Sequence, residues 1–401
     1  MFDGLISRLP IYTRSLDVFG YELQFCSGGA LRANTYDDAA SFGEYLIRAS
    51  HTLKLEELTG ARAGLIRLPA ELLTRCEEVA WPRERLVFAV PDRAINDRAV
   101  SEAMSQLARK GFRIAVDNPS RDLTRLRRDA GFVTLCSLDA TATADLKVLA
   151  GAGLSVDRPP LLVRDLASAD QYDFFQRLGF DYYEGEFFVH PRLVHGTEIP
   201  ANRMGALQLL GRLQDPDVDI HEIEDLVTRD LTLSYKLLRL INSAYFGMPK
   251  HVESIRRAVI FFGLQRIKNW ASVVLINAAD FRPRELLMTA LVRARACELI
   301  AQACKREPTE AYYVAGLFSL LDAIMDVPMG QILERLTLSE PLNQALVEGS
   351  GPIGEVLGSV LALERGDFLG VPILPFSQED VPMRAYLAAI ASAEEMTRQL
   401  Q

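Results

Sequence analysis

The carboxylate of Glu22 is the first side chain in the sequence whose position suggests chemistry. It lies in GYELQFC (20–26), shortly after an apolar run, LISRLPIY (5–12), that predicts a β-strand. A carboxylate after an early strand of a β/α protein is well placed to hold a divalent metal ion. It could equally be a surface charge in a connection between two strands. The elements that position Glu22 therefore decide between the two interpretations.

Short β-branched or apolar runs alternate with helical windows over the first 190 residues. The runs lie at 5–12, 63–68, 85–90, 112–117, 131–138 and 159–165. Amphipathic windows at 39–53, 97–111 and 168–179 predict helices, with Asp97 and Ser168 as N-caps. This alternation predicts a parallel sheet, either open or closed as a barrel, with any chemistry at the carboxyl ends of the strands. No glycine-rich phosphate loop follows the first strand, so a Rossmann fold has no support.

From about residue 200 onward, apolar residues recur at three- and four-residue spacing, which predicts an all-helical domain. Pro191, Gly196 and Pro200 interrupt both patterns, so the boundary should lie near them. We expect an α/β domain at 1–195 and an all-α domain at 196–401.

Composition excludes several classes of function. The 401-residue chain is 49% hydrophobic and carries a formal net charge of −9, which argues against a general nucleic-acid binder. The apolar stretch at 271–279 is about half the length of a membrane span. We therefore expect a cytoplasmic protein that binds neither membrane nor nucleic acid. The five cysteines include no CxxC pair and are expected to be packing residues.

Two segments of the first half resemble the EAL family, which hydrolyses cyclic di-GMP with two divalent metals in a β/α barrel. GYELQFC resembles the family's Glu-Ala-Leu-x-Arg signature, and GFDYYEGEFFVHP (179–191) resembles its late Gly-Phe-x-x-x-Gln-Gly stretch. The resemblance implies a TIM-like barrel, in which Glu22 matches the first metal ligand and Cys26 replaces the signature's arginine.

The second half resembles the HDOD family, a helical relative of HD phosphohydrolases. The stretch 228–270 carries that pattern nearly whole, including Asn242, Ser243, Gly247 and Gly263. Together the two resemblances cover almost the whole chain, in the order of the two-domain EAL–HDOD signalling proteins of bacteria. They imply an EAL-like barrel followed by an HDOD-like helical domain that serves as an output or docking module.

The EAL resemblance also implies that most metal ligands have been lost. Beyond Glu22 and Cys26, the family's site positions fall on Arg67, Ala89, Asp117, Asn118, Thr134, Cys136, Arg164, Ala167 and Glu184. At most two acidic ligands then remain, and arginines place positive charge where cations should bind. On this basis we expect no metal, no cofactor and no enzymatic activity. Arg67 and Arg164 either bind the phosphates of cyclic di-GMP or pair with Asp117, Asp165 or Glu184.

The helical half shows no hydrolytic pair. An HD phosphohydrolase needs adjacent His and Asp, whereas Ser319-Leu320 stands at that place and no two of the five histidines have i, i+4 spacing. A basic line formed by Arg256, Arg257, Arg266 and Lys268 could dock an acidic partner or could be a solvated face.

These observations predict a non-catalytic signalling adaptor in a cyclic di-GMP-linked pathway that acts on signalling proteins by protein–protein contact. Two alternatives stay open. One is a cyclic di-GMP receptor without hydrolysis, and the other is a weak phosphodiesterase that holds one metal through Glu22, Asp117 and Asp165. Self-association as a homodimer through the barrel is a further expectation.

Overall fold

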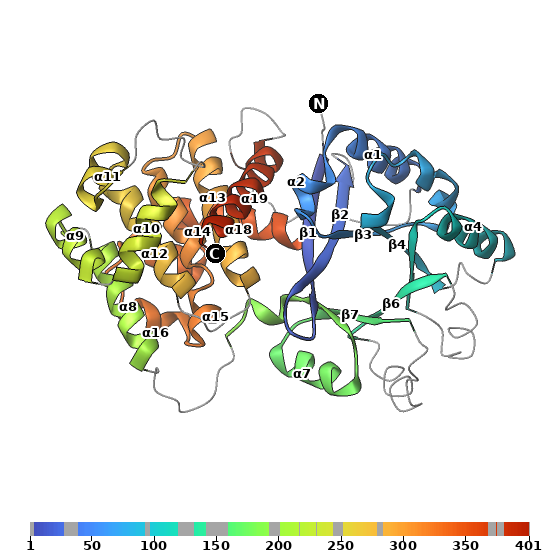
Figure 1. The fold of residues 1–401 in the computed structure, drawn as a ribbon, viewed down its shortest axis with the longest axis horizontal. Helices are drawn as coiled ribbons and strands as arrows, with labels where there is room; N and C mark the ends of the chain where they lie inside the picture. The colour runs from blue at the N-terminus through green and yellow to red at the C-terminus, as the bar shows by residue number, and fades with distance from the viewer. Residues whose placement is uncertain are drawn as a thin grey trace. The chain divides into compact units, whose positions relative to one another are not determined.

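The computed structural model describes residues 4–27, 39–92, 97–118, 132–141, 159–191, 201–215, 217–229, 231–243, 252–278, 284–367, 374 and 381–400. The chain divides into two compact units (Figure 1). One unit comprises Met1–Phe188 with Ala362–Val371, and the other comprises Val189–Leu361 with Pro372–Gln401. The expected boundary at 195/196 lies seven residues after the first of these divisions.

Eight strands close into a barrel in the order of the sequence, which confirms the predicted α/β fold. The strands are β1 (Gly4–Thr13), β2 (Val18–Ser27), β3 (Ala63–Arg67), β4 (Leu86–Pro91), β5 (Arg113–Asp117), β6 (Val133–Asp139), β7 (Leu161–Leu166) and β8 (Tyr182–Gly185). Neighbours from β2 to β8 pair in parallel, but β1 runs antiparallel to both β2 and β8. The expectation of a wholly parallel sheet is therefore wrong at the first strand.

The antiparallel start explains the position of Glu22. A tight turn after Thr13 returns the chain along β1, with Thr13 N–H donating to Asp17 O at 2.8 Å. Glu22 thus lies within β2, opposite Leu9 of β1 and Leu65 of β3, and is neither a loop residue nor a surface charge.

The barrel interior contains a layer of small and branched apolar side chains, as expected for a packed core. Its buried members come from β1 and β3 to β7, and they are Ile11, Leu65, Val87, Ala89, Ala115, Leu135 and Leu162. Alternation along each strand then places the next inward residues at the carboxyl ends of the parallel strands.

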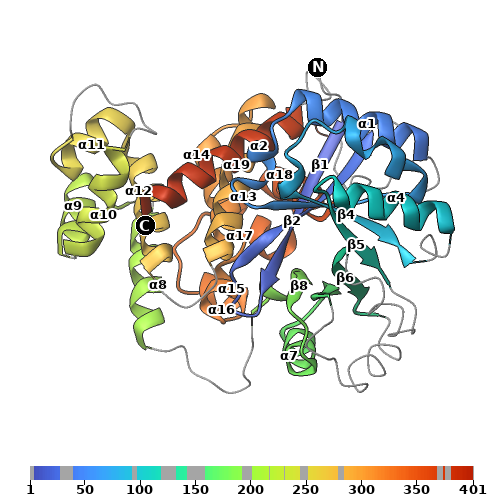
Figure 2. The ribbon, with the colours of Figure 1, turned by 45° about the vertical axis from the view of Figure 1, so that its right-hand side comes forward.

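Helices cover the outside of the strands, as the turned view shows (Figure 2). They are α1 (Ala39–Thr52), α2 (Leu55–Thr59), α4 (Arg98–Arg109) and α7 (Ala169–Leu178), with 3₁₀ segments at Ala70–Glu78, Arg83–Arg85 and Glu186–Phe188. Both predicted N-caps are confirmed, since Asp97 accepts from Ala99 N–H at 2.8 Å and Ser168 from Gln171 N–H at 3.3 Å. Gly179 ends α7 in the left-handed region, at φ 92°.

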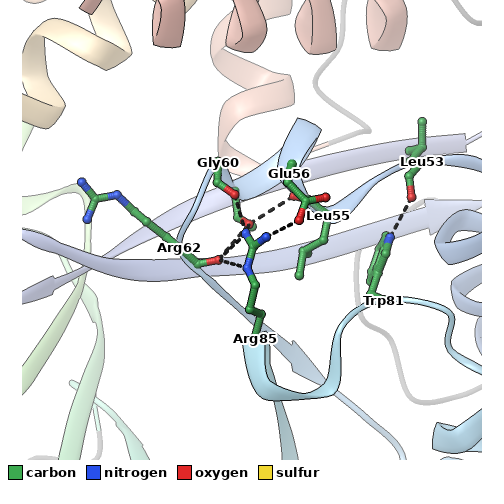
Figure 3. A network of polar contacts seen from close by, with 8 residues as sticks. Leu53, Leu55, Glu56, Gly60, Arg62, Trp81 and Arg85 are labelled. Atoms are coloured by element: carbon green, nitrogen blue, oxygen red, sulfur yellow. Dashed lines mark hydrogen bonds and ion pairs between the residues drawn. The ribbon is translucent and has the colours of Figure 1, made fainter. Parts of the chain in front are cut away.

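A polar network at the amino ends of β3 and β4 fixes α2 to the barrel (Figure 3). Arg85 donates to the carbonyl oxygens of Gly60 and Arg62 and forms an ion pair with Glu56. Cationic side chains commonly bind the free carbonyls at a helix C-terminus. Trp81 donates its indole N–H to Leu53 O at 2.7 Å. Hydrogen bonds from these side chains to backbone carbonyl oxygens therefore stabilise this end of the barrel.

The regular elements of the second unit are all helices in the residues that the structure describes, as predicted. Its helices are α8 (Ala201–Gln214), α9 (Ile220–Arg229), α10 (Leu231–Ile241), α11 (Ile255–Phe262), α12 (Leu264–Ala278), α13 (Arg284–Ala303), α14 (Thr309–Phe318), α15 (Leu321–Met325), α16 (Met329–Leu333), α17 (Glu340–Glu348), α18 (Gly351–Arg365) and α19 (Val381–Leu400). The long helix α13 packs most extensively, against α14 and α19. The last turn of α18, from Ala362, belongs to the barrel unit.

Within the described part of the chain, one stretch, Glu340–Arg365, is long and apolar enough to cross a membrane by length and composition. Core helices of water-soluble proteins pass the same test. In the structure Gly349, at φ 65°, separates this stretch into α17 and α18. The predictions of a cytoplasmic location and of no membrane contact remain predictions.

Candidate functional site

Glu22 is the centre of a charged cluster at the carboxyl ends of the barrel strands. Its side chain is fully buried. Arg67 Nη2 of β3 lies 2.6 Å from its Oε1, and Gln24 Nε2 donates to the same oxygen at 3.1 Å. The residue therefore takes part in a buried ion pair, which in a barrel of this kind is costly unless it is well compensated.

Arg164 of β7 is the second cation of the cluster and contacts three carboxylates. Its Nη2 lies 2.6 Å from Asp139 Oδ1, and its Nη1 lies 3.7 Å from Asp117 Oδ2 and 4.0 Å from Glu22 Oε2. The side chain is only 3% exposed. The carboxylates converge on Arg164 from β2, β5 and β6, so its guanidinium lies between the acids of three strands.

Hydrogen bonds between neighbouring strands hold the acids in place. Asp117 accepts from the hydroxyl of Ser137 on β6, and Asn118 Nδ2 donates to Asp139 Oδ2 at 2.8 Å. The Asp139 backbone N–H in turn donates to Asn118 Oδ1 at 3.1 Å. Asn118 adopts φ 47°, a conformation that asparagine tolerates better than most residues. The pair Asn118–Asp139 therefore joins β5 to β6 at the rim.

Glu184 on β8 completes the set of buried acids. It is 2% exposed, and its Oε2 has no hydrogen-bond partner among the described residues. The next residue, Gly185, has φ 142°, and a Cβ there would lie 2.3 Å from Leu166 N. Only glycine permits this approach of β8 to β7. In the late EAL-like motif, Gly185 thus allows β8 to pack closely against β7, and Glu184 beside it lies inside the barrel.

Two acids of the cluster, Asp117 and Glu184, carry raised pKa values because water is excluded. Burial raises the pKa of Asp117, against the opposing effect of Arg164. Burial and the charge of Glu22 raise the pKa of Glu184 well above its usual value. For Arg164, burial lowers the pKa, but Asp117, Glu22 and Asp139 outweigh it and raise the pKa overall. The fold thus favours the charged form of Arg164 and disfavours ionisation of Asp117 and Glu184.

This donor set does not fit the two divalent metals of the EAL chemistry. Among the described residues, no three His, Cys, Asp or Glu side chains form a group suited to a metal ion. The free oxygen of Glu22 faces Arg164 Nη1 at 4.0 Å. At that distance two like unit charges repel by about 4 kcal/mol at an effective dielectric constant of 20, and a divalent ion doubles this. Arg164 therefore already supplies positive charge among these acids, where a metal ion would have to bind.

Several positions assigned from the resemblance add no charged group to this cluster. Ala89 is buried on β4 in the apolar layer. Thr134 is exposed and donates to Ile114 O at 2.9 Å, and Ala167 is exposed just after β7. The assignments of Thr134 and Ala167 as site positions are corrected accordingly. Alternation along β6 directs Ser137 and Asp139 to the cluster in place of Thr134, and Ala167 lies beyond the end of β7, which contributes Arg164. The Cys26 side chain lies outside the described residues.

Sequence reasoning missed Asp139, Ser137 and Gln24. Asp139 follows GFVTLCSL directly, and the end of a strand is where a barrel places its site. The prediction that at most two of the family's acidic ligands remain stays a prediction, but the rim contains more acids than those two. Four acids gather here, from β2, β5, β6 and β8, and they are Glu22, Asp117, Asp139 and Glu184. Both arginines form ion pairs with acids of the cluster.

The HDOD-like motif has a structural role at the end of α10. Asn242 Nδ2 donates to Leu238 O at 2.9 Å and to Val252 O at 2.8 Å, and Val252 N–H donates back to Asn242 Oδ1 at 2.7 Å. Ser243 is buried, and Gly263 ends α11 at φ 85°. Gly247 lies outside the described residues. Asn242 thus joins α10 to the segment that leads into α11.

Comparison with known proteins identifies the helical part and gives relatives for the whole chain. Residues 199–336 match the HDOD domain family. The chain is 27% identical, over 95% of its length and 90% of the relative, to a Vibrio cholerae protein named cyclic di-GMP phosphodiesterase CdgJ. It is 23% identical to the uncharacterized protein YuxH of Bacillus subtilis, over 90% of this chain and 91% of that one.

A solved structure of Bacillus subtilis YkuI, an EAL-domain protein in complex with cyclic di-GMP and calcium, is also similar. It is 16% identical, and the alignment covers 64% of this chain and 71% of that one, with a TM-score of 0.37.

The prediction that the chain is not an enzyme is contradicted by the Vibrio relative, which is named a phosphodiesterase and is similar nearly end to end. The prediction had counted acids at aligned positions only. The structure shows that Asp139, from an unaligned position, joins the same rim. The number of EAL-family ligands that are lost at aligned positions therefore does not give the number of acids at the rim.

The predicted architecture is confirmed. EAL-like motifs lie on β2 and β8 of a closed β/α barrel, and the matched domain follows in the helical part. The chain therefore contains an HDOD domain at 199–336, which follows a closed β/α barrel that carries EAL-like motifs.

Proposed function

We propose that this protein acts in cyclic di-GMP signalling and that the rim of its barrel is the part that binds the dinucleotide. The observation that carries the proposal is the similarity, over 95% of the chain, to a protein named cyclic di-GMP phosphodiesterase. The acid–arginine cluster lies at the barrel end where such folds bind their ligands.

Arg67 is the group best placed to contact a phosphodiester. Its side chain is 24% exposed, whereas that of Arg164 is 3% exposed. Arg67 Nε has no hydrogen-bond partner among the described residues, while Nη2 pairs with Glu22. Nε itself is buried, so the exposed part of the guanidinium is the part that can donate to a phosphate while Nη2 keeps its pair with Glu22. Arg164 is held by Asp139 and stabilises the cluster beneath.

Calorimetric titration with cyclic di-GMP tests this proposal. We expect saturable binding of one dinucleotide per chain, weakened about tenfold or more in Arg67→Ala, since a hydrogen bond to a charged group contributes about 1.5–3 kcal/mol. Arg98→Ala is the matched control, because Arg98 is exposed on α4 and its one ion pair among the described residues is with Glu102. A flat titration, or equal affinity in Arg67→Ala, contradicts the proposal.

Hydrolysis of cyclic di-GMP is the second candidate function, favoured by the name of the Vibrio relative. Chromatography of the nucleotide after incubation with magnesium or manganese tests it. Turnover that is lost in Glu22→Gln supports hydrolysis at this rim. Binding without turnover leaves the receptor role, and turnover that survives Glu22→Gln places the chemistry elsewhere. The predictions of signalling partners and of a homodimer are not tested by a single chain and stay predictions.

A further inference from the structure

The helical unit contains a cavity that neither resemblance accounts for. Its volume is about 340 Å³, at the lower end of the range for sites that bind small molecules. Its walls come from α11, α12, α13, α14 and α19, all within one compact unit. A cavity lined by five helices of one unit belongs to that unit and includes no residue of the barrel.

One wall of the cavity is aromatic. Phe262 and Trp270 meet edge to face, with ring centroids 4.9 Å apart, and Tyr313 of α14 also lines the space. Leu291 of α13 and Met396 of α19 add apolar surface. Aromatic rings that border an open cavity provide π-faces on which a planar ring system can stack.

The polar groups of the cavity are charged and come from different helices. Arg266 of α12 is exposed and has neither a hydrogen bond nor an ion pair with any described residue. Arg295 and Glu298 of α13 form an ion pair at 2.5 Å, and Glu310 of α14 is half-buried. The cavity thus offers one uncommitted guanidinium for an anion and a carboxylate that can accept from donors of a ligand.

The basic line of the sequence explains why Arg266 stands apart. Arg256 pairs with Glu224 at 3.0 Å, and Arg257 pairs with Glu253 at 3.7 Å. Lys268 is buried and donates to Asp215 O at 2.8 Å. Three of the four cations therefore have partners within the fold. Because of this, the basic line does not form a continuous docking surface. Arg266 is the member that borders the cavity.

We propose that this cavity binds a purine mononucleotide, with the base against the aromatic wall and the phosphate on Arg266. A planar heteroaromatic ring suits Phe262 and Trp270, its amino groups suit Glu310, and its anionic group suits the guanidinium. A fatty acid lacks the hydrogen-bond donors, and a sugar phosphate lacks the ring. The small volume favours one nucleotide over two.

Titration of the full-length chain with GMP and AMP tests the proposal. The chain has two tryptophans, so Trp270 should report binding through its fluorescence, with calorimetry as the second readout. We expect saturable binding of one nucleotide, and about tenfold weaker binding in Arg266→Ala because a charge-assisted hydrogen bond is lost. Arg257→Ala, exposed on the neighbouring α11, should bind like the unchanged protein.

Three results overturn the proposal. The first is no saturable binding of either nucleotide up to millimolar concentration. The second is unchanged affinity in Arg266→Ala, or adenosine binding as tightly as AMP, since either would show that Arg266 does not bind the phosphate. The third is inorganic phosphate binding as tightly as GMP, which would show that the aromatic wall contributes nothing to binding. None of these outcomes depends on whether the barrel binds cyclic di-GMP, so the two proposals fail separately.

Discussion

The barrel rim and the helical cavity use arginine in opposite ways. At the rim, Arg164 is buried and contacts three acids, Asp117, Asp139 and Glu22. Its positive charge is therefore balanced by acids of the barrel itself. In the cavity, Arg266 is exposed and contacts no described acid. The first arrangement resists an incoming ion because its own cation is already there. The second can bind an anion without breaking an existing pair. Net charge alone does not distinguish them, but the partners of each guanidinium do.

The largest effect should follow from removing the cation at the rim. Arg164→Met leaves several buried acids without their common partner, and removing one member of a buried ion pair typically costs about 3–5 kcal/mol. Urea denaturation at pH 7, followed by circular dichroism, measures the free energy of unfolding. A loss below about 1 kcal/mol would show that the acids do not depend on Arg164.

A smaller loss is expected from the neutral link in the helical unit. Asn242→Ala breaks three hydrogen bonds to the backbone of Leu238 and Val252 and should cost about 1–3 kcal/mol. Because no charge is involved, the loss should be the same at low and high salt. Hydrogen exchange should localise it to α10 and the start of α11, and exchange that is faster only in the barrel would refute the assignment.

Glu184 should make stability depend on pH in the direction opposite to an ordinary salt bridge. Its pKa is raised in the folded state, so the folded chain binds the proton more tightly than the unfolded chain. The stability contributed by this proton is full below the usual carboxyl pKa of about 4.3 and is lost as the pH rises through the folded-state value. Glu184→Gln should therefore be more stable than the unchanged protein at pH 8, by on the order of 1 kcal/mol.

Denaturation midpoints measured from pH 5 to pH 8 test this sign. The unchanged protein should lose stability as the pH rises, and Glu184→Gln should show a smaller slope. Asp117, whose pKa is also raised, contributes in the same direction and remains in both proteins. An equal slope in the two proteins would mean that Glu184 is ionised at no cost.

The smallest effect on stability belongs to the cavity. Arg266→Ala removes a side chain with no described partner, so the free energy of unfolding should change by less than about 0.5 kcal/mol. Thermal unfolding without nucleotide measures it. A clear destabilisation would show that Arg266 supports the fold and is not held available for a ligand.

The sequence predicted the elements well where periodicity and caps agreed. The helices at 97–111 and 168–179 form with Asp97 and Ser168 as caps, because both signals are local. The reversal of β1 and the position of Glu22 within β2 were missed, since only strand pairing determines direction. Asp139 was missed because its role depends on meeting Arg164 across two strands. The cavity of the helical unit requires five helices to meet, which no local pattern reveals.

The most direct test of this account is equilibrium dialysis of the full-length chain against Mn²⁺. Because Arg164 already contributes the positive charge among the acids at the rim, we expect no tight binding at micromolar metal. Two Mn²⁺ ions bound per chain in that range, and lost in Glu22→Gln, would contradict the account, because the acids would then be holding metals where the structure places Arg164.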